Sequence, residues 1–312
     1  MQTDKGRFST RTRSMLAAVG ASALLAGGCV SVPNDTEMVH HVTEMSQAFS
    51  IGAISECLAQ NCRSVQPAPT LRELDPDSIS VLNWNILKGK RDNWSEDFRQ
   101  FASEQDIVII QEAMLHDGLI DSLGEHDLNW DMNTGFYIKN VATGVLTASR
   151  VKSVSKQGLR TKEPYLRLPK ATLISRYAMQ NSNQHLLVAN IHSVNFTLDM
   201  QAYTAQIRSL QNELAGHSGP VILAGDFNSW SEDRLAVIEE MVSALSLQSL
   251  SYANHNRTKI FGREIDHVFY RGLEPVQIST REVTSSDHNP ILVTFRMPQP
   301  SAGLAGNSLA PN

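Results

Sequence analysis

Polar residues that can bind a cation or transfer a proton stand at the ends of several apolar stretches in this chain. They are Asn85, Glu112, His192, Asp226, Asn228, Asp266, Asp287 and His288. Carboxylate and amide oxygens are the ligands that hard cations such as Mg²⁺, Mn²⁺ or Ca²⁺ prefer, whereas structural zinc prefers cysteine and histidine. A histidine paired with an aspartate is a common acid–base group. The pattern therefore predicts a hard-cation site with acid–base groups beside it.

The apolar stretches that must position these residues have the patterns of strands and helices. Residues 78–83 alternate between polar and apolar, and the other predicted strands are mostly continuous apolar runs, as in strands buried on both faces. The predicted strands are 78–83, 106–110, 185–191, 220–224, 266–270 and 291–295, and the predicted helices are 202–214 and 233–245. Strands that alternate with helices indicate an α/β domain over residues 75–297. In such domains the ends of separate strands converge on one site.

Six short blocks occur in an order that resembles the endonuclease/exonuclease/phosphatase superfamily, which includes deoxyribonuclease I, abasic-site endonucleases, neutral sphingomyelinases and inositol phosphatases. The blocks are Asn83-Trp84-Asn85, Gln111-Glu112, His192 to Asn195, Gly225 to Asn228, Ile265 to His267 and Ser285 to Asn289. The stretches 166–170, 190–196, 218–230 and 261–273 are most similar to the bacterial YafD-like group. The resemblance implies a two-sheet α/β sandwich with helices on its outer faces, as in deoxyribonuclease I.

The same resemblance implies a role for each polar residue in divalent-metal-dependent hydrolysis of a phosphoester. Asn85, Glu112 and Asp287 match the metal-binding region, with Mg²⁺ or else Mn²⁺ or Ca²⁺ as the cofactor. The positions that match catalytic residues are His192, Asp226, Asn228, Asp266 and His288. Asp226 and Asn228 match the pair that places the attacking water and contacts the phosphoryl oxygens, and Asp266 matches the residue that orients His288. Whether Asp226 or His288 is the base, and whether one metal or two are bound, stays open at this point.

Each residue also has a simpler interpretation. Asn85 can cap a turn, as asparagine often does at a strand end, and Asp287-His288 can be part of an ordinary loop. Glu112 follows four apolar residues, and a buried carboxylate needs a partner. The remaining eight histidines are expected to be ordinary surface or hydrogen-bonded residues, and His267 is expected on the opposite strand face from Asp266.

The N-terminus resembles a bacterial lipoprotein signal. Four basic residues precede an apolar stretch at 15–26, and Leu24 to Gly28 leads with small residues into Cys29. Cleavage would remove residues 1–28 and leave Cys29 as a lipidated first residue; an ordinary secretory signal or a short buried helix is the alternative. The pattern predicts a lipid-anchored protein of the cell envelope, with the outer membrane favoured over the inner membrane because Val30 follows Cys29.

The segments outside the α/β domain are weakly patterned. Residues 29–74 are expected to be a tether with one short helix near 42–59, and the tail at 298–312, rich in Pro, Gly, Ser and Ala, is expected to be disordered. Cys57 and Cys62 can form a local disulfide in an oxidising compartment or remain buried free thiols.

Charge and composition limit the possible substrates. The formal net charge is -5, and hydrophobic residues make up 41% of the 312 residues, which excludes a disordered chain and argues against a basic DNA-coating protein. Between Arg150 and Lys170, seven basic residues face one glutamate, Glu163, which suggests a docking surface for a polyanion or an anionic membrane, or else an ordinary solvated strand face.

A nucleic acid is the favoured substrate of the predicted enzyme. The candidate substrate contacts are Arg167, Lys170, Asn195, Trp230 and Arg263. Trp230 can stack on a base or pack in the core. The alternatives are a lipid phosphodiesterase of the sphingomyelinase or phospholipase C kind, a phosphomonoesterase, and a non-catalytic envelope binding protein. We expect the protein to be a monomer.

Overall fold

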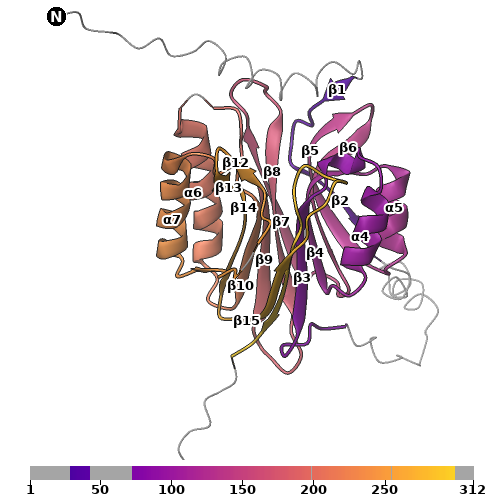
Figure 1. Cartoon of the computed structure of the whole chain (residues 1–312), viewed down its shortest axis with the longest axis vertical. Coiled ribbons are helices and arrows are strands. Elements are labelled where there is room, and N and C mark those ends of the chain that lie inside the picture. The colour runs from indigo at the N-terminus through magenta and orange to yellow at the C-terminus, as the bar shows by residue number, and fades with distance from the viewer. Residues whose placement is uncertain (1–28, 43–71, 198, 254, 299–312) are drawn as a thin grey trace, which may run out of the picture.

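The fold is a sandwich of two β-sheets with helices on the outside. The computed structural model describes residues 29–42, 72–197, 199–253 and 255–298. In Figure 1 the sheets face each other, with α4 and α5 outside one sheet and α6 and α7 outside the other. The predicted two-sheet α/β sandwich is confirmed.

The first sheet has eight strands in the order β1-β5-β6-β4-β3-β16-β15, with β2 also paired to β5. Its strands are β1 (Val30–Ser31), β2 (Glu37–His41), β3 (Ile79–Asn85), β4 (Ile107–Met114), β5 (Asn129–Ile138), β6 (Val141–Ser149), β15 (Glu274–Thr280) and β16 (Ile291–Arg296). The 3-10 turn η1 (Leu87–Gly89) follows β3, and the helices of this side are α4 (Trp94–Ala102) and α5 (Asp117–Gly124).

The second sheet has six strands in the order β11-β14-β10-β9-β8-β7. They are β7 (Ser155–Lys162), β8 (Pro169–Ala178), β9 (His185–His192), β10 (Val221–Asp226), β11 (Gln248–Ser249) and β14 (Asp266–Arg271). The helices of this side are α6 (Gln201–Ala215) and α7 (Glu232–Ala244), and a separate hairpin consists of β12 (Lys259–Ile260) and β13 (Arg263–Glu264).

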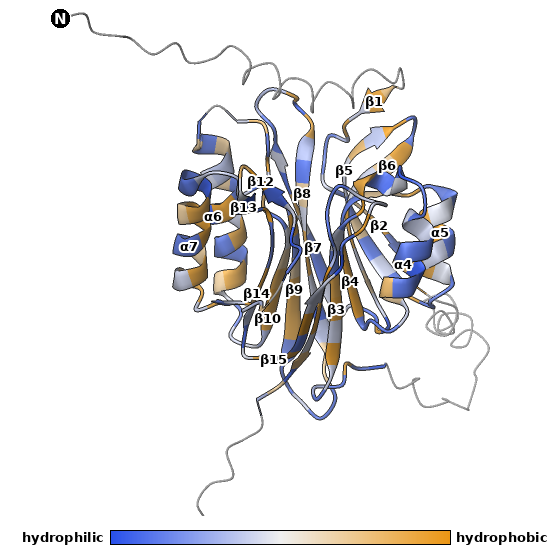
Figure 2. Ribbon diagram, viewed as in Figure 1, coloured by the Kyte–Doolittle hydropathy of each residue, from blue (hydrophilic) through white to orange (hydrophobic). Residues whose placement is uncertain are grey.

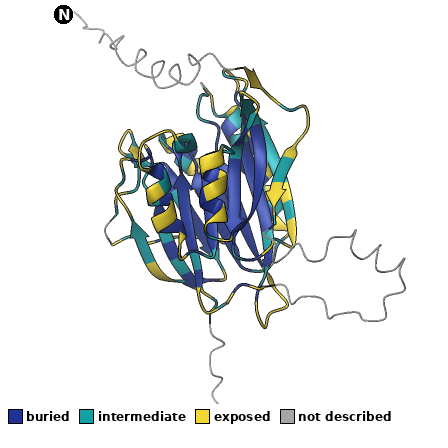
Figure 3. Ribbon diagram, turned by 90° about the vertical axis from the view of Figure 1, so that its right-hand side faces the viewer, coloured by how far each residue is buried: buried dark blue, intermediate teal, exposed yellow. Residues whose placement is uncertain are grey.

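Three apolar layers hold the sandwich together. The middle layer lies between the sheets and includes Val81, Val188 and Ile222, while the outer layers pack each sheet against its own helices. The apolar strands are therefore covered on both faces, which explains their unbroken hydrophobic runs. Figure 2 shows these strands in orange, and Figure 3 shows them buried behind helices whose outer faces are exposed.

The six strands and two helices predicted from the sequence are all present, each shifted by a few residues at most. Other elements were not predicted because their sequences lack the expected periodicity. The edge strand β7 reads Ser-Lys-Gln-Gly-Leu-Arg-Thr-Lys and has one large apolar residue. β5 buries polar residues such as Asn133 between the sheets, so its alternation is obscured.

The expectation of a tether from residue 29 onward is wrong for its first part. β1 pairs with the end of β5, and β2 pairs with residues 130–134 of the same strand, so this segment is part of the first sheet. The predicted signal peptide at 1–28, most of the helix expected near 42–59, Cys57, Cys62 and the tail from 299 onward lie outside the described residues. Within the described part of the chain, none of the helices has the length and apolar character needed to cross a membrane.

Candidate active site

The space between the two sheets changes from apolar to polar toward the end where β3, β4, β9 and β10 finish. Above the apolar middle layer lies a set of buried amides, in which Gln111 donates to Asn83 Oδ1 at 3.0 Å and to Asn190 Oδ1 at 2.8 Å. Asn190 in turn donates to main-chain oxygens of the opposite sheet, such as Leu146 O at 2.9 Å. These hydrogen bonds fix the relative position of the sheets just below the candidate catalytic residues.

A β-bulge places Glu112. Between β4 and β6, two residues (Gln111 and Glu112) face one residue, and Glu112 has a positive φ of 50°. Ile110 and Ala113 on either side both pack into the outer apolar layer. The bulge therefore adds one residue while the side chains after it keep the same faces of the sheet. The carboxylate of Glu112 accepts from the ammonium of Lys88, which follows β3.

Asp226 ends β10 at a position where the chain comes very close to β9. Gly225 has a φ of +152°, and a Cβ there would lie 1.9 Å from Ile191 O, so only glycine fits. The carboxylate of Asp226 accepts from the main-chain N–H of Asn228 at 2.9 Å and from Asn85 Nδ2 at 3.1 Å. Asn228 donates its own side chain to Ser193 O at 3.0 Å, which ties together the two loops that follow β9 and β10.

Asp266 and His288 form the predicted pair. His288 Nδ1 lies 2.8 Å from Asp266 Oδ2, and its other ring nitrogen faces Asp226 Oδ2 at 3.8 Å and Asn85 Nδ2 at 3.5 Å. His192 approaches the same Asp226 oxygen at 3.3 Å. The structure therefore brings together five residues predicted from widely separated parts of the sequence, namely Asn85, His192, Asp226, Asp266 and His288. Asn85 has both of the roles considered for it. Its Nδ2 contacts the site, and its Oδ1 accepts from Leu87 N and so closes a turn.

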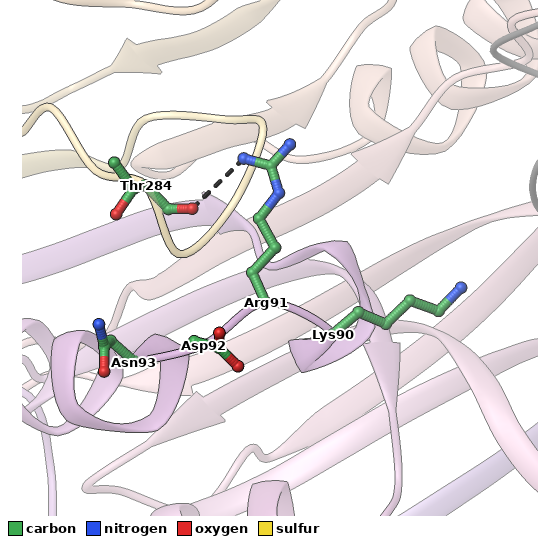
Figure 4. A pocket seen from close by; sticks show the side chains of 5 residues that line it. All are labelled: Lys90, Arg91, Asp92, Asn93 and Thr284. Carbon is green, nitrogen blue, oxygen red and sulfur yellow. Dashed lines mark hydrogen bonds between the residues drawn. The ribbon is translucent and has the colours of Figure 1, made fainter.

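The loop that carries His288 is held from several sides. Trp84 Nε1 donates to His288 O at 2.8 Å, and Ser286 Oγ donates to Asn85 O at 2.6 Å. A surface pocket beside this loop is lined by Lys90, Arg91, Asp92, Asn93 and Thr284 (Figure 4). In it, Arg91 donates to Thr284 O at 3.3 Å and to Ser286 O at 2.5 Å. This pocket is thus a support for the loop.

The charges at the site are set by burial and by two lysines. Burial would raise the pKa of Glu112, but the ammonium groups of Lys88 and Lys170 outweigh it, so the pKa is lowered and the carboxyl is ionised. Burial, together with the nearby ammonium of Lys170, lowers the pKa of His192 to about 3, and Lys170 Nζ lies 2.7 Å from His192 Nε2. Burial also acts to lower the pKa of His288, but the carboxylates of Asp266 and Asp226 raise it to about 10. His192 is therefore neutral and His288 protonated near neutral pH.

The raised pKa of His288 predicts a pH-dependent contribution to stability. The folded chain holds this proton more tightly than the unfolded chain, so the stabilisation is complete below pH 6.5 and is lost as the pH rises toward about 10. We expect His288→Gln to reduce the free energy of unfolding more at the acidic end of this range than near pH 10. Urea denaturation in EDTA at both pH values measures this difference.

His217→Gln is the matched control for that measurement. Burial lowers the pKa of His217, so any pH-dependent stabilisation it gives is lost on acidification and has the opposite sign. An effect of His288→Gln that is constant with pH, or larger near pH 10, would contradict the assignment of a protonated His288.

The donor atoms suit a hard cation, although not in the grouping predicted. Among the described residues, the candidate ligands that lie within 4.8 Å of one another in a group of three are Asp226, Asp266 and His288, all buried. Glu112 and Asp287 lie outside this group, and Asp287 is exposed, with its carboxylate accepting from Ser286 Oγ at 3.5 Å. The structure places Asn85 at the group through its contact with Asp226. Buried carboxylates and an amide fit a divalent cation of the Mg²⁺ type.

The five predicted substrate contacts lie in different places, and one of them, Arg263, is turned toward α7. Lys170 lies in the site through its contact with His192, and Arg167 is exposed on the neighbouring loop. Asn195 and Trp230 hold each other, with Trp230 Nε1 donating to Asn195 Oδ1 at 2.9 Å. Arg263 belongs to the hairpin and is paired with the exposed Glu232 at 2.6 Å, because the two-residue strand β13 directs it to α7.

The basic stretch from Arg150 to Lys170 does not form one continuous surface. Arg150 donates to Gln105 O, Lys156 is paired with Asp131, and Arg160 donates to Pro33 O. Contacts within the fold therefore neutralise or occupy much of this charge. The basic residues of the stretch that remain exposed are Lys152, Lys162 and Arg167.

Arg234 is a supporting residue that the sequence did not indicate. It is 1% exposed, and its guanidinium donates to main-chain oxygens of Val194, Asn195 and Asn228 and to Thr197 Oγ1, at 2.8 to 2.9 Å. The rings of Tyr203 and Trp230 lie 4.5 and 4.3 Å from its central carbon. Glu163 adds a second support, since its buried carboxylate accepts from Asn195 N at 2.7 Å. An isolated arginine in an otherwise ordinary helix gives no sequence signal of this role.

We expect Arg234→Met to lower the free energy of unfolding by about 3 kcal/mol or more, because buried acceptors left without a donor cost about 1–3 kcal/mol each. Urea denaturation measures the effect. Arg208→Met, on the exposed side of α6, is the control and should change stability little. A loss of less than about 1 kcal/mol in Arg234→Met would show that the loops do not depend on this residue.

Comparison with known proteins agrees with this geometry. A match to the Endonuclease/Exonuclease/phosphatase family covers residues 82–288. The UPF0294 protein of Vibrio campbellii (strain ATCC BAA-1116) is 39% identical over 228 residues, which are 72% of this chain and 80% of that protein. Among solved structures, ANGEL2, described as a 2',3'-cyclic phosphatase in complex with adenosine-2',3'-vanadate, has a TM-score of 0.56 at 16% identity, over 74% of this chain and 99% of that one.

A second solved structure, D. rerio TDP2 complexed with single strand DNA product, has a TM-score of 0.53 at 17% identity and covers 70% of this chain and 99% of that one. At these identities the two structures share the fold. The family match spans more than half of the 312 residues and includes the blocks around Asn85, Glu112, Asp226 and His288. This chain belongs to the endonuclease/exonuclease/phosphatase family.

Proposed function

We propose that the protein is a divalent-metal-dependent phosphodiesterase of the bacterial cell envelope, anchored by a lipid on Cys29, and that a nucleic acid strand is its substrate. The observation that carries the chemistry is the convergence of Asn85, His192 and His288 on the buried carboxylate of Asp226, beside the ionised Glu112. A phosphodiester is an anion that repels nucleophiles, so hydrolysis needs both a placed water and nearby positive charge.

Asp226 is the group that places the attacking water and takes its proton. Its carboxylate is held by Asn85 and by the amide of Asn228, so its orientation is fixed before substrate binds. His288 is protonated and held by Asp266, so it donates a hydrogen bond to a phosphoryl oxygen. This assigns the base role to Asp226 and the role of an electrostatic clamp to His288.

Lys170 and His192 also lie beside Asp226, and the ammonium of Lys170, held by His192 Nε2, supplies a further donor to the phosphoryl group. When bound at the carboxylates, Mg²⁺, or Mn²⁺ or Ca²⁺ in its place, supplies neutralising charge for a phosphoryl oxygen. In the balanced step, water forms a P–O bond as the ester P–O bond breaks. Asp226 receives a proton from the water, and the leaving oxygen takes one from solvent.

A rim of aromatic and basic side chains supports a strand of nucleic acid as the substrate. Trp230 contacts the ring of Phe261 edge-on, with 6.1 Å between their centres, and Phe261 is 62% exposed. Tyr165, which is 57% exposed, and the exposed Arg167 lie on the loop that leads to Lys170. Exposed rings that stack on bases, next to cations that contact phosphates, are typical of proteins that bind single strands. The similarity to TDP2, solved with a single-stranded DNA product, is consistent with this choice.

We expect Phe261→Ala and Tyr165→Ala each to raise KM for a single-stranded oligonucleotide by about tenfold, since stacking on one base contributes about 1–3 kcal/mol. Hydrolysis of bis(p-nitrophenyl) phosphate, which carries no base, should change little. Val276→Ala removes a comparably exposed apolar side chain from the distant strand β15 and serves as the control. Equal effects on both substrates, or none on the oligonucleotide, would contradict a nucleic acid substrate.

A lipid phosphodiester is the second candidate substrate. The observation that favours it is the position of Cys29, which the structure holds at the end of the β5–β6 hairpin. Assays with sphingomyelin and phospholipid vesicles, run beside the oligonucleotide assay, decide between the two substrates.

A further inference from the structure

We propose that the end of the molecule at which the active site opens faces the phospholipid bilayer, so that the enzyme works on phosphoesters presented at the membrane surface. This inference rests on the lipid anchor at Cys29 that is part of the proposed function. It goes beyond that function, because an anchor on a flexible tether would leave the active site free to point in any direction.

Cys29 is attached to the folded domain without a tether. Lys139 N donates to Cys29 O at 2.9 Å, and Val30 and Ser31 pair with Ile138 and Tyr137. The chain that follows is also held, because Arg160 donates to Pro33 O at 3.0 Å and to Asn34 O at 3.2 Å. β2 then continues the pairing with β5. A lipid on Cys29 would therefore fix one particular end of the domain at the membrane.

The strand registers show that this end is the one that contains the active site. On β4, Ala113 follows Glu112 directly and pairs with Gly144 of β6, which in turn pairs with Thr134 of β5. Ile138, the partner of Val30, lies four residues farther along β5. Because β5 has a bulge between Thr134 and Phe136, the same span on β6 is only three residues, from Gly144 to Val141. At a rise of about 3.3 Å per residue, the start of β1 lies about 10 Å beyond the level of Ala113 along the strands. Figure 1 shows β1 at the top, and the registers place it beside the tip of the β5–β6 hairpin.

The side chains exposed at this end suit the boundary between water and lipid. Val30 and Val32 are 43% and 41% exposed, and Lys139 is exposed at the tip of the β5–β6 hairpin. Tyr165 and Phe261 are exposed on loops next to the active site. Aliphatic and aromatic side chains together with a lysine are the combination that is enriched at membrane interfaces. The surface that we propose to contact the bilayer therefore lies at the same end of the domain as the opening of the site.

The opposite end of the domain provides an internal control. β9 runs toward the active site and ends at His192, so the turn that precedes it, with the exposed Asn183, lies at the far end of the second sheet. If the active site faces the bilayer, Asn183 lies about the length of strand β9 farther from the lipid than the active-site residues do. A domain that tumbles on a tether exposes both ends to lipid alike.

Photocrosslinking in native membranes tests this orientation. The full chain is produced in bacteria with p-benzoylphenylalanine in place of Lys139, Tyr165 or Asn183, and phospholipid adducts are measured after irradiation. We expect phospholipid adducts from positions 139 and 165 and few or none from position 183. Adducts of equal strength at the two ends, or stronger at 183, would overturn the proposal, and so would a wild-type chain that fractionates away from membranes.

A spacer variant separates orientation from anchoring. Inserting about 20 Gly/Ser residues between Cys29 and Val30 adds a flexible link with an average span of about 25 Å. The lipid stays in place, so the variant should remain in the membrane fraction but lose the difference between positions 139 and 183. An unchanged difference between positions 139 and 183 would contradict a role for the β1 attachment. Metal-dependent hydrolysis of bis(p-nitrophenyl) phosphate in the same membranes reports the proposed chemistry independently of both crosslinking results.

Discussion

We expect Asp226→Asn to lower kcat for phosphodiester hydrolysis by at least ~10²-fold, the scale of losing a positioned acid–base group. The substitution keeps the size of the side chain and its ability to accept from Asn228 N, so the loop after β10 can stay in place. It removes the negative charge that faces His192 and His288 and the group that accepts a proton from the water. The measurement is kcat and KM on bis(p-nitrophenyl) phosphate at saturating Mg²⁺ or Mn²⁺.

Asp233→Asn is the matched control for Asp226→Asn, since Asp233 is exposed in the first turn of α7. It should keep wild-type rates. Circular dichroism and urea denaturation establish that both variants are folded. Wild-type kcat in a folded Asp226→Asn variant would rule out Asp226 as the group that activates the water.

The second large effect is expected at His288. We expect His288→Ala to lower kcat by at least ~10²-fold, because a preorganised donor to the developing phosphoryl charge is worth about 10²–10³ in rate. The deletion also leaves Asp226 and Asp266 close together without the imidazolium between them. Comparing kcat of the variant and the wild type at saturating metal measures the loss.

The control for His288→Ala is His217→Ala, since His217 is partly buried at the far end of the domain and contacts Pro220 O. Asp266→Asn tests positioning. It keeps His288 but weakens the hold on its proton, so the pH at which activity falls on the basic side should move downward. A folded His288→Ala variant with wild-type kcat, or an Asp266→Asn variant with an unchanged pH profile, would contradict the assigned roles.

The fold and the central site were predictable because their signals are local. Buried strands are unbroken apolar runs, and Asp226 and His288 follow or precede such runs directly. Once the strands pack, the residues at their ends must meet, since the ends of neighbouring strands share one edge. The Asp266–His288 pair and the opposite orientation of His267, which stacks on Phe269 and contacts Ser229 Oγ, are confirmed for this reason.

Features that depend on distant packing were not predictable. The bulge at Glu112 needs β6 as its reference, and the contact of Lys88 with Glu112 depends on the positive φ values of Leu87 and Lys88. Arg263 is three residues from Asp266 in sequence, but the hairpin turns it to Glu232. Residues 30–41 look like a tether because their strands are short and bind only at the edge of a sheet formed much later in the chain.

The basic stretch from Arg150 to Lys170 illustrates the same limit. Local charge counting adds these residues together, but β7 and β8 distribute them over different partners. Lys156 is paired with Asp131 and Arg160 holds the segment at Pro33, while Lys170 reaches His192. The basic residues of the stretch are therefore not gathered on one strand face, and Lys170 is the one that the structure places beside His192.

The central claim, that this chain hydrolyses phosphodiesters with a divalent cation, is tested most directly by one assay. The chain from Val30 onward, without Cys29, is dialysed against EDTA, and cleavage of bis(p-nitrophenyl) phosphate and of a single-stranded oligonucleotide is followed before and after Mg²⁺ or Mn²⁺ is restored. We predict that cleavage is absent in EDTA and returns in proportion to the added metal. Full activity in EDTA, or no cleavage of any phosphoester after metal is restored, would contradict the claim.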